Sequence, residues 1–89
     1  MTIDSRVGAN VASRRQQRNI DADALAQALR VTSGEILAWE AGAERIPPAK
    51  IVDLAELFDC APSSFFEGLA ASERAEAATR YGLGHDNRD

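Results

Sequence analysis

Apolar residues recur three and four positions apart along most of the chain, the spacing that places them on one face of an α-helix. No stretch alternates apolar and polar residues as a half-buried strand does, and alanine, a strong helix former, is the commonest residue. The pattern therefore predicts an all-α protein with helical segments at about residues 5–18, 22–29, 33–41, 48–59, 62–69 and 72–81.

Residues that commonly cap helices mark several of these boundaries. Asp21 precedes the second segment as an N-cap, and Thr32 with Glu35 three residues later forms the pattern of a capping box before the third. Gly42 is the expected end of the third segment, because glycine readily adopts the left-handed conformation that closes many helices. Ser72 is the expected cap of the last segment.

A length of 89 residues suits one small domain. We expect the five segments within residues 7–69 to close a single core, preceded by an N-terminal arm of residues 1–6. Residues 70–89 are expected to form a C-terminal extension beyond this core, made of a short polar helix and then a frayed tail.

The charge balance changes when it is divided along the chain. The net charge of −4 and the pI of 4.9 argue against a uniformly basic nucleic-acid-binding domain. Residues 1–50, however, hold seven basic and six acidic side chains, whereas residues 51–89 hold three basic and eight acidic ones. The acidity is concentrated in the second half, so the net charge does not exclude a DNA partner.

Several classes of function have no basis in the sequence. The single cysteine, Cys60, and the single histidine, His85, cannot assemble a metal site or a nucleophile–base pair, and the six glycines are too scattered for a phosphate-binding loop. We therefore expect no enzymatic activity, metal, cofactor or small-molecule ligand. No apolar run is long enough to cross a membrane and no signal peptide is recognisable, so the expected location is cytoplasmic, away from membranes.

Residues 22–41 match a helix-turn-helix motif, two short helices with a tight connection. Together with the flanking segments, the chain resembles the Cro/cI-type (xenobiotic response element) helix-turn-helix family. The resemblance spans about residues 7–69 and rests on Val7-Gly8, Arg14-Arg15, Asp21-x3-Leu25-Ala26-x2-Leu29-x-Val31-Thr32, Ile36-x2-Trp39-Glu40-x-Gly42, Ile51-x2-Leu54-Ala55-x2-Phe58 and Pro62-x2-Phe65-Phe66-Glu67. It implies a compact five-helix lambda-repressor-like domain.

The resemblance also implies roles for individual positions. Segment 33–41 would be the recognition helix in the major groove of double-stranded DNA, and Arg15 with Glu40 would form a structural ion pair. Trp39 is expected in the core. The positions implied to face DNA bases are Thr32, Ser33, Gly34, Glu35 and Ala38, and those implied to face phosphates are Arg14, Arg18, Ala22, Arg30, Arg45 and Lys50. Those implied at a dimer contact are Phe65, Phe66 and Leu69, with at least one of the two phenylalanines expected in the core instead.

The sequence departs from the family where bases are read. None of the base-facing residues can form the bidentate contacts by which Arg reads guanine and Gln reads adenine. Ala22 replaces a frequent Gln, and Arg30 replaces the usual turn glycine. The leading interpretation is a sequence-specific transcriptional regulator that binds DNA as a homodimer. The alternative is a protein-interaction module on the same scaffold, antitoxin-like or an anti-activator, with weakened DNA binding and a protein partner.

Overall fold

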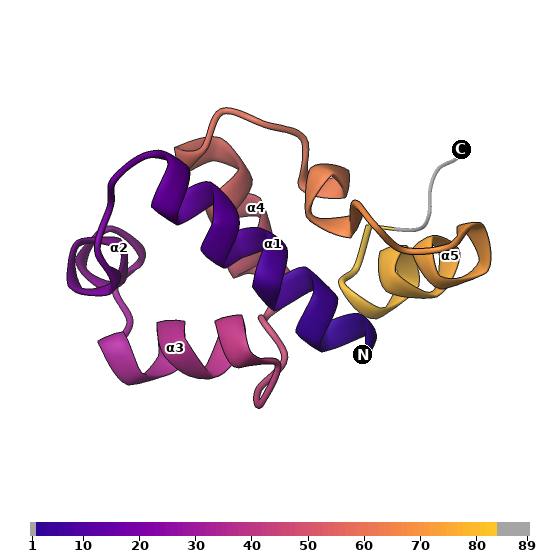
Figure 1. The fold of residues 1–89 in the computed structure, drawn as a ribbon, viewed down its shortest axis with the longest axis horizontal. Coiled ribbons are helices and arrows are strands. Elements are labelled where there is room, and N and C mark those ends of the chain that lie inside the picture. Colours follow the sequence, from indigo (N-terminus) through magenta and orange to yellow (C-terminus); the bar gives the residue numbers. More distant parts are fainter. Residues whose placement is uncertain (1, 84–89) are drawn as a thin grey trace.

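The structure, a computed structural model, describes residues 2–83, and within that range every regular element is a helix (Figure 1). This confirms the predicted all-α class. Residues 84–89, where the sequence predicts a frayed tail, lie outside the described residues, as does His85. The elements are α1 (Ile3–Gln17), α2 (Ala22–Leu29), α3 (Ser33–Ala41), α4 (Pro48–Leu57), the short 3₁₀ helix η1 (Pro62–Phe66) and α5 (Ala71–Arg80).

Helix α1 begins earlier than the sequence predicts, so most of the expected N-terminal arm is helical. The Thr2 hydroxyl oxygen accepts a hydrogen bond from the Ser5 N–H at 3.0 Å, and the Ser5 hydroxyl oxygen accepts one from the Thr2 N–H at 2.9 Å. These two bonds cap the first turn. Ile3 is buried against the core, which holds that turn in place.

Helices α2 and α3 begin and end as predicted, because their caps form. The Asp21 carboxylate accepts from the Ala24 N–H at 2.7 Å. The capping box of α3 is complete, since Thr32 accepts from the Glu35 N–H at 3.1 Å and Glu35 accepts from the Thr32 N–H at 3.0 Å. Gly42 then ends α3 in the left-handed conformation, with φ of 76°.

The next two segments are shorter than predicted. Helix α4 ends at Leu57 because the chain turns at once, with Asp59 in the left-handed region at φ of 54°. The segment from Pro62 is a 3₁₀ helix that stops at Phe66 instead of a helix through residue 69. Its tight turn places the Phe65 ring edge-on to that of Phe58, with ring centroids 6.3 Å apart.

Helix α1 crosses the middle of the molecule and contacts α3 on one side and η1 on another (Figure 1). Its contact with α3 depends on Gly8, where a Cβ atom would lie 2.1 Å from the Trp39 carbonyl oxygen. No other residue fits at that distance. The largest fully buried side chains of the core are Tyr81, Phe58, Phe65, Leu25, Ile36, Ile46, Ile51, Leu54, Val7 and Val11.

Residues 70–83 belong to the same core, which corrects the expectation of an extension beyond it. Ala77 and Tyr81 are buried, and the Tyr81 ring packs at a tilt on that of Phe66, with ring centroids 6.0 Å apart. The helix begins one residue earlier than predicted. Its first turn is held by the Glu73 carboxylate, which accepts from the Ala70 N–H at 3.0 Å, and not by a Ser72 cap.

Candidate nucleic-acid interface

The connection between α2 and α3 is a tight turn centred on Arg30. This residue has φ of 61° and ψ of 44°, so it ends α2 in the left-handed conformation that glycine adopts most readily. The Val31 N–H donates to the Ala26 carbonyl at 3.0 Å, and α3 begins two residues later. The two helices are thus joined by a three-residue turn, as the helix-turn-helix pattern requires.

Helix α3 has one buried face and one exposed face. Ile36 and Trp39 are 1% and 3% exposed, so they attach the helix to the core, and Trp39 is unavailable for stacking on a base. At 3.6 residues per turn, the side of the helix opposite these two residues carries Gly34, Leu37, Ala38 and Ala41. Leu37 is 54% exposed. Sequence reasoning named the small residues of this face but missed Leu37, although its spacing from Gly34 and Ala41 was visible.

The polar side chains at the start of α3 are already engaged within the protein. The Ser33 hydroxyl donates to the Asp23 carboxylate on α2. The Glu35 carboxylate turns back to the Thr32 N–H in the capping box. Ser33 and Glu35 are therefore not presented as free hydrogen-bonding groups at the outer face of the helix.

An ion pair fixes the last turn of α3 to α1. Arg15 donates to both Glu40 carboxylate oxygens, from Nε at 2.6 Å and from Nη2 at 3.0 Å, and its Nη1 donates to the Ile20 carbonyl at 2.9 Å. The two side chains are only 13% and 9% exposed. The hydrogen bond to Glu40 raises the pKa of Arg15 despite the opposing effect of burial. This is the pair that the family resemblance implied.

Two of the basic residues implied to face phosphates hold neighbouring elements. Arg14 on α1 lies 3.9 Å from the Glu67 carboxylate. Arg18, which ends α1, donates to the Phe58 carbonyl at the end of α4. Both contacts tie α1 to the segment that follows α4.

The other implied phosphate positions lie on α2, on α4 and in the connections on either side of α3. Arg45, in the loop after α3, lies 3.4 Å from the Asp4 carboxylate, and its side chain is 54% exposed. Lys50 on α4 donates to the Leu29 carbonyl at 2.8 Å. Ala22 begins α2 and carries no charge. Arg30 is exposed, and its side chain makes no hydrogen bond or ion pair with any residue within 2–83.

The residues implied at a dimer contact are mostly internal. Phe65 and Phe66 are 0% and 2% exposed, packed on Phe58 and Tyr81 respectively, so neither ring is available to a second molecule. At least one of the two rings was expected in the core, and the structure buries both. Leu69 is only partly buried and remains at the surface.

Two further features bear on function. No helix within residues 2–83 is long and apolar enough to cross a membrane. In the same range, no cluster of three or more His, Cys, Asp or Glu side chains is arranged to hold a metal ion.

Comparison with known proteins gives a consistent assignment. The helix-turn-helix family model matches residues 11–65. Two relatives, both from Sinorhizobium fredii (strain NBRC 101917 / NGR234), are named uncharacterized HTH-type transcriptional regulators. One, y4wC, is 27% identical over 74 residues, which is 83% of this chain and 52% of the relative. The other, y4aM, is 28% identical over 67 residues, 75% of this chain and 47% of the relative.

The chain thus spans about half the length of the curated relatives it matches. No solved structure matches it significantly. The family match covers more than half of the chain and includes α2, the turn at Arg30 and α3, which the structure arranges as a helix-turn-helix unit. This protein is a member of the Cro/cI-type helix-turn-helix family.

Proposed function

We propose that this protein binds double-stranded DNA and regulates transcription, with α3 as the recognition helix in the major groove. The observation that carries the proposal is the way α3 is attached to the rest of the protein along one side only. Ile36, Trp39 and the Arg15–Glu40 pair hold one side of the helix rigidly. On the opposite side Gly34, Leu37 and Ala41 are exposed and Ala38 is half-buried. A rigidly held helix with a free outer face suits insertion into a groove.

Phosphate contacts would position the domain on the duplex without reading its sequence. Arg30 is the strongest basic candidate, because it is exposed and unpaired within the described residues and lies in the turn between α2 and α3. The first turns of α2 and α3 add backbone N–H groups, which favour anions at helix N-termini. Arg14, Arg18, Arg45 and Lys50 remain secondary candidates, since each is held by another protein group.

Binding as a homodimer is part of the proposal, because one small domain makes few contacts and two-fold pairing doubles them. With both phenylalanine rings internal, the surface left for pairing is the edge between η1 and α5. A hollow there is lined by Pro62, Ser63, Phe66, Arg74, Ala75, Ala78 and Leu83. Leu69 lies on the segment that joins these two elements. Sedimentation equilibrium should give a dimer mass that Ala78→Glu converts to a monomer.

The DNA-binding proposal is tested by fluorescence anisotropy with a duplex from upstream of the protein's own coding region. Affinity should fall steeply between about 50 and about 200 mM salt. Protein binding releases cations from the DNA phosphates, and this release becomes less favourable as the salt concentration rises. Arg30→Ala should lower the affinity and make the salt slope shallower by about one. Arg6→Ala is the matched control, since it removes the same charge near the start of α1, at the end of the molecule opposite α2, and it should leave the slope unchanged.

The alternative function is a module that binds a protein partner. It is favoured by one observation, the engagement of Ser33 and Glu35 inside the protein, which leaves the outer face of α3 without hydrogen-bonding side chains. Absence of binding to any duplex at about 50 mM salt would contradict the DNA proposal and favour the module. We also propose a cytoplasmic location, as expected for a protein that binds DNA and regulates transcription.

A further inference from the structure

The outer face of α3 is apolar and carries no hydrogen-bonding side chains. Leu37 and Val52 are the two large hydrophobic side chains that are exposed within residues 2–83, at 54% and 41%. Leu37 lies on α3, beside Gly34, Ala38 and Ala41. These three neighbours have little or no side chain, so the Leu37 side chain is the most prominent group on the face.

The major groove offers one apolar group that such a face can contact. Each A·T pair presents the thymine 5-methyl group there, next to hydrogen-bonding groups on both bases. A G·C pair presents only donors and acceptors on that edge. Apolar side chains are known to contact the thymine methyl, whereas guanine and adenine are usually read by Arg, Lys, Asn or Gln, none of which lies on α3.

Starting from the proposed DNA-binding function, we propose that Leu37 is the specificity-determining residue of α3 and that it reads thymine through the 5-methyl group. Ala38, one position later on the same face, supplies a second and smaller apolar contact. Gly34 lets the backbone approach the base edges closely, since the space around its missing Cβ is open except for the Thr32 hydroxyl at 3.8 Å. The preferred site is therefore rich in A·T pairs at the positions that α3 covers.

A protein occupant fits this face less well than DNA. Stable protein interfaces depend on several large anchors, typically Trp, Tyr or Arg, buried at the centre of a patch. The face of α3 carries a single large side chain with small residues around it. One leucine among small residues suits contact with individual methyl groups along a groove.

The test compares four duplexes of equal length, about 20 base pairs each, which spans two helical turns. The first contains A·T pairs and the second has uracil in place of thymine, which removes only the 5-methyl group. The third contains G·C pairs, and the fourth carries 5-methylcytosine, which adds a methyl at the same position in the groove. In anisotropy titrations of the full chain, the thymine duplex should bind more tightly than the uracil duplex, and the 5-methylcytosine duplex more tightly than the unmethylated G·C duplex. The expected difference is roughly fourfold in affinity for each methyl group buried.

Leu37→Ala should abolish most of the difference between methylated and unmethylated duplexes. Because Leu37 is exposed, this variant should keep the wild-type circular dichroism spectrum. Val52→Ala is the matched control, since it truncates the other exposed apolar side chain, on α4, and should retain the full preference for methylated duplexes.

Each remaining outcome overturns a defined part of the proposal. Equal affinity of the wild-type protein for methylated and unmethylated duplexes would overturn methyl readout and leave the DNA-binding function standing. A methyl preference that survives in Leu37→Ala would overturn the assignment to this residue. Failure to bind any of the four duplexes at low salt would overturn both the readout and the DNA-binding function, and would assign this face to a protein partner.

Discussion

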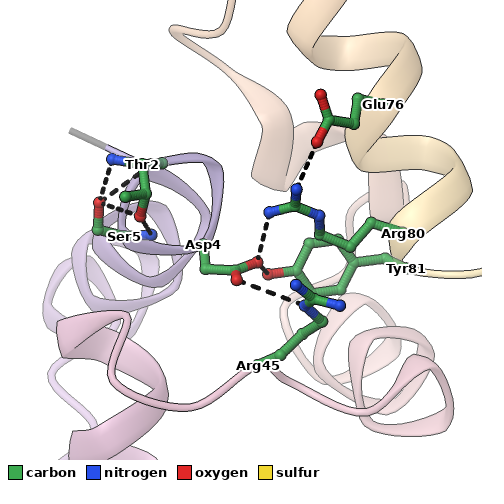
Figure 2. Close-up of polar contacts among 7 residues, drawn as sticks. All are labelled: Thr2, Asp4, Ser5, Arg45, Glu76, Arg80 and Tyr81. Carbon is green, nitrogen blue, oxygen red and sulfur yellow. Dashed lines mark hydrogen bonds and ion pairs between the residues drawn. The ribbon is translucent and has the colours of Figure 1, made fainter.

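The Tyr81 hydroxyl donates a 2.6 Å hydrogen bond to the Asp4 carboxylate and so joins the end of α5 to the first turn of α1 (Figure 2). The same carboxylate lies 3.4 Å from Arg45 in the loop after α3 and 3.4 Å from Arg80 on α5. Arg80 is also paired with Glu76. Asp4 is therefore the point where three elements of the fold meet.

Asp4 should contribute to stability in a pH-dependent way. Burial alone would raise the pKa of its carboxyl, but the Tyr81 hydrogen bond and the charges of Arg45 and Arg80 outweigh burial and lower that pKa below its ordinary value of 3.8. A carboxyl with a lowered pKa stabilises the fold fully above its ordinary pKa, and this contribution is lost as the pH falls through the lowered value.

Urea unfolding at a series of pH values from about 6 down to about 2 should show this loss. Asp4→Asn should be less stable than wild type at neutral pH and should lose less stability on acidification. Asp53→Asn removes the same charge from the surface of α4 and should follow the wild-type slope. Parallel curves for wild type and Asp4→Asn would contradict this role for Asp4.

Tyr81 gives a direct optical measurement of the same contact, because it is the only tyrosine in the chain. Burial, reinforced by the hydrogen bond to Asp4, raises the pKa of the Tyr81 hydroxyl above its ordinary value of 10.0. Tyrosinate absorbance should therefore appear at higher pH than in the unfolded chain. In Asp4→Asn the midpoint should move back toward the ordinary value, and an unchanged midpoint in a variant still folded by circular dichroism would rule out coupling of these residues.

Removal of one partner from the Arg15–Glu40 pair should destabilise the fold strongly. Glu40→Ala leaves the largely buried Arg15 guanidinium without its counter-charge, which should lower the free energy of unfolding by about 3 kcal/mol. The double variant Arg15→Met/Glu40→Leu removes both charges and should be more stable than Glu40→Ala alone. Thermal melts of the two variants measure the difference, and equal stabilities would show that the loss comes from packing alone.

The same substitution at two glycines should have opposite effects. Gly8→Ala would place a methyl group 2.1 Å from the Trp39 carbonyl oxygen and force α1 away from α3, so it should cost about 3 kcal/mol. Gly34→Ala points into open space on a helix and should stabilise the fold by about 0.5 kcal/mol. Chemical unfolding of both variants measures these changes. An unchanged stability of Gly8→Ala would contradict the close crossing of α1 and α3.

Arg30→Gly should stabilise the fold while weakening DNA binding. Glycine removes the cost of a side chain at φ of 61°, a gain of about 1 kcal/mol, and also removes the exposed charge. Asp59→Gly is the comparison, because Asp59 also has positive φ, although aspartate tolerates that region better. It should give a smaller rise in melting temperature with unchanged DNA affinity. A destabilised Arg30→Gly would show that the arginine side chain supports the turn.

The parts of the fold that the sequence predicted well are those specified by neighbouring residues. Asp21, Thr32 with Glu35, and Gly42 set the ends of α2 and α3 through hydrogen bonds that span only a few positions. Their side chains and spacing are visible in the sequence itself. The turn at Arg30 and the bounds of α3 in the candidate site followed from these signals and from the family resemblance.

The parts that escaped prediction depend on contacts between distant positions. Asp4 and Tyr81 are 77 residues apart, and no local pattern shows that α5 packs into the core. The same packing encloses Phe66, for which the family resemblance implied a dimer contact. Leu37 was missed for another reason, because helical periodicity predicts that apolar residues lie on the buried face and gives no signal for an exposed one.

Because α5 packs against the start of α1, we expect both helices to unfold together with the rest of the core. The family match spans residues 11–65, yet Val7, Ala77 and Tyr81 outside it are fully buried. A fragment trimmed to the matched segment would lose Phe66 together with its partner Tyr81, and would also lose the first two turns of α1. Figure 1 places the start of α1 beside α5, at the end of the molecule opposite α2. The described part of the chain, residues 2–83, thus begins away from the turn between α2 and α3 and leaves that turn accessible.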